Sequence, residues 1–82
     1  MPNTDIAADS ELDARGLKCP EPVMLLHARV RDMQTGEVVR VLTTDPSTQR
    51  DIPQFCQFLG HELLSQTQQE ELFVFLLRKG KR

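Results

Sequence analysis

The sequence predicts a two-layer α/β sandwich in the order β-α-β-α-β-β, with two helices on one face of a four-stranded mixed sheet. Its 82 residues are enough for one small core. Four short segments have the alternation or the β-branched composition of strands, and two longer ones repeat apolar residues at helical spacing. Because right-handed crossovers would bring both helices to the same side of the sheet, this is the simplest arrangement that covers every apolar face.

The first strand and the first helix are expected on either side of a turn at Gly16. Residues 11–16 alternate like a short strand. The helical pattern begins just after Cys19, where Pro20 suits the first helical position because its fixed φ is already helical. The helix is expected to end within residues 34–37. The apolar residues that share one of its faces are Val23, Leu26, Val30 and Met33.

The second strand and the second helix follow in residues 37–60. Residues 37–44 are rich in β-branched side chains and predict a strand. Two helix starts are possible, with Asp45 as the cap before Pro46 or with Asp51 as the cap of a capping box around Pro53. We favour the first, with a helix that is tightened or bent near Pro53. Its apolar stripe and the glycine that closes it are Ile52, Phe55, Cys56, Leu59 and Gly60.

Two further strands are predicted at the C-terminal end, in residues 61–68 and 71–79. The Gln/Glu-rich residues 66–71 are expected to be an exposed hairpin connection between them. Alternation in the last strand would direct three side chains to the core, those of Phe73, Phe75 and Leu77.

The composition predicts a single globular domain. Hydrophobic residues make up 39% of the chain and charged residues 27%, which is typical of a folded protein. Residues 1–10 are polar and aperiodic and lack the pattern of a signal peptide, so we expect a flexible tail there and one domain over residues 11–82. No apolar stretch is long enough to span a membrane, and the expected location is the cytoplasm.

Charge and cysteine content argue against several kinds of function. A net charge of −2 disfavours strong binding to nucleic acid, which needs clustered cations. The two cysteines form no CxxC motif and no zinc-binding spacing with histidine, so we expect neither a disulfide nor a structural metal to stabilise the fold. A monomer is expected because no apolar stripe remains beyond those assigned to the core.

The two cysteines have different surroundings. Cys56 lies within an apolar helical stripe and is expected to be buried and inert. Cys19 lies where a loop meets a helix, next to Lys18, so we expect its thiolate to form readily. A nucleophilic enzyme would also need a base, but neither His27 nor His61 is placed beside Cys19 by the sequence.

The residues after Cys19 restrict the backbone. Pro20 and Pro22 have no N–H group, so few donors remain in the first helical turn, and Glu21 suits the positive end of the helix dipole. This motif fixes the position of the thiol more than it solvates a negative charge. It therefore favours a sulfur that is presented outward to a partner over an enclosed catalytic nucleophile.

The sequence closely resembles the TusA (SirA-like) family of sulfur-carrier proteins. The resemblance extends from Leu12 to Gly80 and includes the Cys-Pro-x-Pro element that the family shares. The matching motifs are LDARGLKCPEPVM at residues 12–24, DP at 45–46, TQRDIPQFC at 48–56, HEL at 61–63 and LRKG at 77–80. The resemblance implies the same β-α-β-α-β-β fold, without a cofactor, and implies that Cys19 carries a persulfide.

The resemblance also implies the partners of this chemistry. In such carriers a pyridoxal-phosphate cysteine desulfurase transfers sulfane sulfur to the cysteine, and a downstream sulfur relay receives it for 2-thiolation of the wobble uridine in certain tRNAs. Related members deliver sulfur elsewhere, including molybdenum cofactor synthesis and dissimilatory sulfur oxidation.

A docking surface for these partners is expected beside Cys19. Met24, His27 and Arg31 form a ridge along the first helix at i, i+3, i+7 spacing. Alternatively, Met24 and His27 pack at the margin of the core while Arg31 is solvated. Family members often have arginine at the position of His27, so the charge of this ridge is open. Asp45, Arg50 and Asp51 match the family motifs at residues 45–46 and 48–56, but capping and local ion pairing explain them equally well.

Two other functions compete with the sulfur carrier. The first is a regulatory module that binds nucleic acid through its basic residues. Those residues are Arg29, Arg31, Arg40, Arg78, Lys79, Lys81 and Arg82. The acidic net charge and the absence of Trp and Tyr count against it. The second is a stand-alone thiol oxidoreductase or sulfurtransferase, against which the missing CxxC motif and the missing base count.

Overall fold

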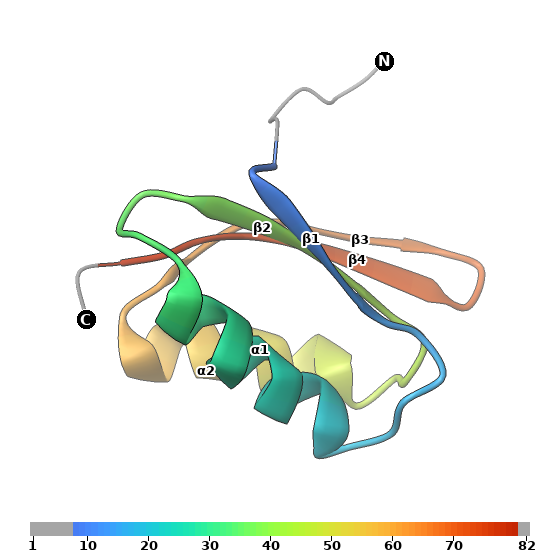
Figure 1. Cartoon of the computed structure of the whole chain (residues 1–82). Helices are drawn as coiled ribbons and strands as arrows, with labels where there is room; N and C mark the ends of the chain where they lie inside the picture. The colour runs from blue at the N-terminus through green and yellow to red at the C-terminus, as the bar shows by residue number, and fades with distance from the viewer. Residues whose placement is uncertain (1–7, 81–82) are drawn as a thin grey trace.

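The computed structural model describes residues 8–80 and has the predicted order of elements. The sheet has the strand order β1-β2-β4-β3, in which β1 and β2 are parallel and the other pairs antiparallel. Both helices lie side by side on one face of this sheet (Figure 1), which confirms the predicted two-layer sandwich. The elements are β1 (Ser10–Ala14), α1 (Glu21–Asp32), β2 (Val38–Thr43), α2 (Thr48–Leu59), β3 (Glu62–Gln69) and β4 (Leu72–Arg78).

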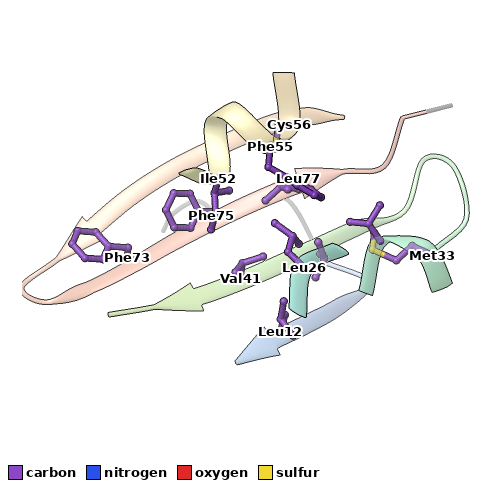
Figure 2. Packing of buried hydrophobic residues seen from close by; sticks show 12 residues of the cluster. Leu12, Leu26, Met33, Val41, Ile52, Phe55, Cys56, Phe73, Phe75 and Leu77 are labelled. Atoms are coloured by element: carbon purple, nitrogen blue, oxygen red, sulfur yellow. The ribbon is translucent and has the colours of Figure 1, made fainter. Parts of the chain in front are cut away.

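The core fills the space between the helices and the sheet (Figure 2). Alternate residues of the strands point inward, and the predicted helical stripes meet them. Burial of each large apolar side chain stabilises the fold by about 1.5–3 kcal/mol. The strands contribute Leu12, Val39, Val41, Phe73, Phe75 and Leu77, and the helices contribute Leu26, Val30, Met33, Ile52, Phe55 and Cys56.

Helix α1 begins one residue later than predicted. Pro20 is the N-cap, with φ −98° and ψ 11°, and Pro22 occupies the second helical position. The backbone N–H of Glu21 donates to the carbonyl of Lys18, so the chain makes a turn before the helix starts. The helix also ends earlier than predicted, at Asp32, because residues 34–37 form a separate turn.

Helix α2 begins at Thr48, after a turn at Pro46. The N–H of Thr48 donates to the carbonyl of Asp45 at 3.0 Å, and the next two residues make similar bonds three residues back, so the start is tightened. The favoured start is therefore close to the observed one. The alternative start was wrong, because Asp51 lies inside the first turn of the helix instead of capping it.

Pro53 does not interrupt α2. A proline removes the bond to the carbonyl four residues earlier, here that of Gln49. The side-chain Nε2 of Gln66 on β3 donates to this carbonyl at 3.3 Å, so the group left free by Pro53 regains a partner. The helix ends at Gly60, whose φ of 80° belongs to the left-handed region that glycine tolerates.

Strand β3 is displaced by one residue from the predicted residues 61–68, and the connection that follows it is shorter than the predicted residues 66–71. The strand runs through the Gln-rich segment to Gln69, and the connection to β4 is only Glu70–Glu71. Gln66 and Gln68 pair with β4 and also reach α2, where the Nε2 of Gln49 donates to the Oε1 of Gln68 at 3.3 Å. The error arose because glutamines here occupy positions that alternation would assign to apolar side chains.

The N-terminal boundary is also earlier than expected. The N–H of Asp9 donates to the carbonyl of Val38 at 2.7 Å, and β1 starts at Ser10, so the sheet already includes part of the expected tail. Residues 1–7 of that tail lie outside the described residues, and the single domain over residues 11–82 remains a prediction. Within residues 8–80 no helix is long and apolar enough to cross a membrane.

The sheet face away from the helices carries apolar side chains that the sequence analysis did not assign. Leu42, Leu72, Val74 and Leu76 alternate with core residues along β2 and β4 and are half-buried. The reason given for expecting a monomer was therefore incomplete. The monomer itself remains a prediction.

Candidate functional site

Cys19 lies in the loop between β1 and α1, and its side chain is exposed as expected. Because β1 and β2 are parallel, the connections that follow them leave the same end of the sheet (Figure 1). Two bonds join these connections: the N–H of Gly16 donates to Thr44 Oγ1 at 2.9 Å, and the N–H of Cys19 donates to Asp45 Oδ2 at 2.7 Å. The Cys19–Pro20 peptide bond is cis. The backbone of the cysteine loop is thus held by hydrogen bonds to the connection between β2 and α2.

Asp45 organises this junction. Its carboxylate accepts bonds from the N–H and the Oγ of Ser47 as well as from Cys19. These hydrogen bonds lower the pKa of Asp45 below its usual value of 3.8, and the bond from the Cys19 amide has the largest effect. The backbone carbonyl of Asp45 accepts a hydrogen bond from Thr48 Oγ1 at 2.6 Å. Thr48 Oγ1 in turn lies 2.7 Å from the buried hydroxyl of Thr43. A charged Asp45 therefore ties the cysteine loop to the first turn of α2.

The thiol itself faces a second carboxylate. Cys19 Sγ lies 3.4 Å from Asp51 Oδ2, within hydrogen-bond distance for sulfur. The hydrogen bond to Asp51 is the largest cause that raises the pKa of Cys19, followed by partial loss of hydration and by the negative charge of Asp51. The expectation of a readily formed thiolate is therefore wrong: the surroundings of Cys19 favour the protonated thiol.

The reason lies in where the nearby N–H groups point. The amide of Glu21 donates to Lys18, and that of Cys19 donates to Asp45. Pro20 has no N–H, so these amides do not solvate the sulfur. Lys18 stabilises the charge of Asp45 and is not among the causes that shift the thiol.

An open groove of about 780 Å³ adjoins Cys19 between α1 and α2. Two of its lining residues are in contact, because the ring of His27 meets Phe55 edge to face with centroids 4.6 Å apart. Phe58, which is 84% exposed, lies at its margin. The groove residues are Cys19, Pro20, Val23, His27, Asp51, Gln54, Phe55, Gln57, Phe58 and Leu59. The thiol thus lies beside an apolar surface that is accessible to another molecule.

The sequence analysis did not predict that Phe58 lines the groove or that Asp51 contacts Cys19. Phe58 lies off the apolar stripe of α2, and an aromatic residue on a polar helix face was the signal available for it. The sequence showed Asp51 as part of a motif, but its contact with Cys19 joins residues 32 positions apart.

The residues of the expected docking ridge are partly brought together. Met24 is 60% exposed on α1 and is not among the groove residues, whereas His27 lines the groove. Arg31 is exposed but lines a second, smaller cavity of about 330 Å³, together with His27. Arg50 is exposed, and its Nε lies 3.3 Å from Asp51 Oδ1. Met24 therefore does not pack at the margin of the core, whereas His27 packs on Phe55.

The other candidate groups have structural surroundings. Cys56 is 3% exposed, and burial raises its pKa to about 11, which confirms the expected inert thiol. His61 Nδ1 accepts a bond from the N–H of Gly80 at 3.0 Å. In the part of the chain that the structure describes, no group of three or more His, Cys, Asp or Glu residues is arranged to hold a metal ion.

Comparisons with known proteins show the family of this chain. The family model described as Sulfurtransferase TusA matches residues 10–79. The chain belongs to the TusA family. It is 55% identical over 76 residues to the Sulfur carrier protein TusA of Pseudomonas entomophila (strain L48), covering 93% of this chain and 95% of the relative. It is 53% identical over 73 residues to the protein of the same name from Pseudomonas aeruginosa (strain LESB58), covering 89% and 92%.

A solved structure confirms the fold. A SirA-like protein from Desulfitobacterium hafniense superposes with a TM-score of 0.76, covering 88% of this chain and 99% of its own. The two sequences are 19% identical, so this likeness concerns the fold alone.

Proposed function

We propose that this TusA-family chain is a sulfur carrier. Cys19 accepts sulfane sulfur as a persulfide from a pyridoxal-phosphate cysteine desulfurase and passes it to a downstream relay for 2-thiolation of the wobble uridine in tRNA. The names of its curated relatives, Sulfur carrier protein TusA, support the carrier role. The donor, the relay and the tRNA product follow from the family resemblance.

The observation that carries the proposal is the contrast between the two thiols. Cys19 is exposed at the mouth of an open groove, on a backbone attached to Asp45, whereas Cys56 is buried in the core. A carrier needs one thiol that a partner's active site can reach and a position that stays fixed between partners. Cys19 meets both needs, and the chemistry requires no metal or cofactor of its own.

Sulfur acceptance is an exchange at sulfur. Cys19 Sγ, once it has lost its proton, attacks the outer sulfur of the donor's cysteine persulfide. A new bond forms between Sγ and that sulfur, while the donor's S–S bond breaks with its electron pair on the donor cysteine. The donor leaves as a thiolate and takes up a proton. Delivery repeats the exchange, with Cys19 as the leaving thiolate.

Partner docking is proposed for the surface around the groove, formed by Met24, His27 and Phe58 with Arg31, Asp45 and Arg50 at its borders. Phe58 is an exposed apolar side chain that lines the groove with Cys19, and Met24 is an exposed apolar side chain on α1, a combination typical of a protein-binding surface. Met24→Glu should weaken desulfurase binding about tenfold or more without changing the urea midpoint. Thr67→Glu on β3, outside the groove, is the control. Equal affinities of both variants would contradict this docking surface.

The pathway is tested in a bacterial strain that lacks its own carrier of this family. Expression of the chain should restore 2-thiouridine in tRNA, and Cys19→Ser should not. If the chain accepts sulfur from the desulfurase but leaves 2-thiouridine absent, the proposed tRNA destination is wrong, and another pathway such as molybdenum cofactor synthesis receives the sulfur.

The nucleic-acid alternative gains no support from the basic residues that the structure describes. Arg40 and Arg78 are paired with Glu11 and Glu62, and Lys79 donates to a backbone carbonyl. Pairing of this kind leaves little clustered positive charge for phosphates. The expected location of the carrier remains the cytoplasm.

A further inference from the structure

The contact between Cys19 and Asp51 is unusual for a reactive thiol. Asp51 Oδ2 is 3.4 Å from Cys19 Sγ, and the Asp51 side chain is only 20% exposed. Its other oxygen faces Arg50 Nε at 3.3 Å, and Arg50 is itself 71% exposed. Asp51, in the first turn of α2, thus places its carboxylate beside the sulfur of Cys19.

The other groups around the thiol do not offset this carboxylate. Asp45, from the connection before α2, adds a second negative charge, and only the hydroxyl of Ser47 favours the thiolate. Lys18 and Glu21 lie within two residues of Cys19, His27 and Asp51 line the groove with it, Asp45 accepts a bond from its amide, and Arg50 pairs with Asp51. The groups in closest contact with Sγ therefore disfavour a negative charge on it.

We propose that Asp51 is a positioning residue that disfavours negative charge on Cys19 Sγ and thereby slows both uptake and loss of sulfur while the carrier is free. This inference rests on the proposed function and adds a control on its reactivity. Fast transfer then requires a partner that separates Asp51 from the sulfur or neutralises its charge.

The same charge appears on Sγ in both directions of transfer. During uptake, Sγ must lose its proton before it attacks the donor's outer sulfur. During loss, an acceptor thiolate attacks the outer sulfur of the loaded carrier, the Sγ–S bond breaks, and its electron pair stays on Sγ until a proton arrives. Asp51 opposes both steps, so a small persulfide or polysulfide should load the free carrier slowly, and a small thiol should unload it slowly.

The unloaded carrier is tested by alkylation of Cys19 with iodoacetamide from pH 6 to pH 10, followed by mass spectrometry. Asp51→Asn should shift the rate profile to lower pH. Each unit of pKa lost raises the thiolate fraction at pH 7 about tenfold and lowers the nucleophilicity of each thiolate about threefold, a net gain of about threefold. Asp51→Glu, which keeps the charge, should stay closer to the original profile. Glu62→Gln, which removes the same charge far from the thiol, should not shift it.

The loaded carrier is tested by treating the protein with inorganic polysulfide, removing the excess and following the loss of the added sulfur to glutathione. Asp51→Asn should lose it faster than the original chain, and Glu62→Gln at the original rate. An alkylation profile unchanged by Asp51→Asn, or a slower loss of sulfur from that variant, would overturn the inference. Neither result would affect the proposed function, which fails only if Cys19 does not accept sulfur from a desulfurase.

Discussion

The buried pair of threonines beneath the cysteine loop gives a prediction whose size follows from the structure. Thr48 Oγ1 donates to the carbonyl of Asp45 at 2.6 Å, so the hydroxyl of Thr43 must be the donor in the 2.7 Å contact with Thr48. Both threonines are essentially inaccessible to solvent. Replacement of either by valine keeps the shape and removes one hydroxyl.

The two single substitutions should differ in cost. Thr48→Val leaves the buried Thr43 hydroxyl without a partner and should destabilise the fold by about 1–3 kcal/mol. The Asp45 carbonyl keeps the bond from the N–H of residue 48 at 3.0 Å. Thr43→Val leaves the Thr48 bond to Asp45 intact and should cost about 1 kcal/mol. In the double variant the unpartnered hydroxyl is gone, so its cost should be about 1 kcal/mol below the sum of the singles.

Urea unfolding followed by far-UV circular dichroism measures these free energies, because the chain has no Trp or Tyr for fluorescence. Strictly additive costs would refute the coupling between the two hydroxyls, and a Thr43→Val cost that exceeds the Thr48→Val cost would refute the assigned direction of the bond between them.

Two further predictions concern the C-terminal side of the fold. Gly80→Ala should destabilise it by about 1–3 kcal/mol in the same urea assay, because a Cβ there would collide with the carbonyl oxygen of Gly60; unchanged stability would show that this approach is looser than described. Burial, with the positive charge of Lys79 next in importance, lowers the pKa of His61 below 6.5, so the folded state binds this proton less readily than the unfolded state. The stability that depends on neutral His61 should therefore be fully present above pH 6.5 and be lost as the pH drops below it. His61→Gln should reduce the difference in urea midpoint between pH 7.5 and pH 5.5. An equal difference in both proteins would contradict this role of His61.

The order and the layers of the fold were predictable because they depend on local periodicity. The stripe that contains Ile52 and Phe55, and the alternation of Phe73 with Phe75, both predicted buried faces that the structure has. Glycine at position 60 predicted the end of α2 for a local reason, its tolerance of positive φ. Elements whose cause lies within a few residues were thus accessible to sequence reasoning.

The errors arose where distant residues decide the outcome. The connection between β3 and β4 is shorter than the predicted residues 66–71 because Gln66 and Gln68 pair with β4 and find partners on α2, which local hydrophobicity does not reveal. The pKa of Cys19 is raised because the fold brings Asp51 to its sulfur. The helix start and Lys18 suggested the opposite direction, since these local signals contain no information about a carboxylate on another element.

The exposure of Cys19 was predictable, and its reactivity was not. The Cys-Pro-x-Pro element fixes the thiol at the start of a helix from purely local causes, and the structure confirms that this thiol is exposed. The groove beside it depends on how α1 and α2 pack. That packing also leaves Phe58 at the groove margin.

The central claim is that Cys19 is the residue that carries sulfur. The most direct test incubates the chain with a cysteine desulfurase and cysteine, then maps the added mass by mass spectrometry before and after reduction. The account predicts one added sulfur atom on Cys19, lost under reductant, present in Cys56→Ala and absent in a folded Cys19→Ala variant. No added sulfur, or sulfur carried on Cys56, would contradict it.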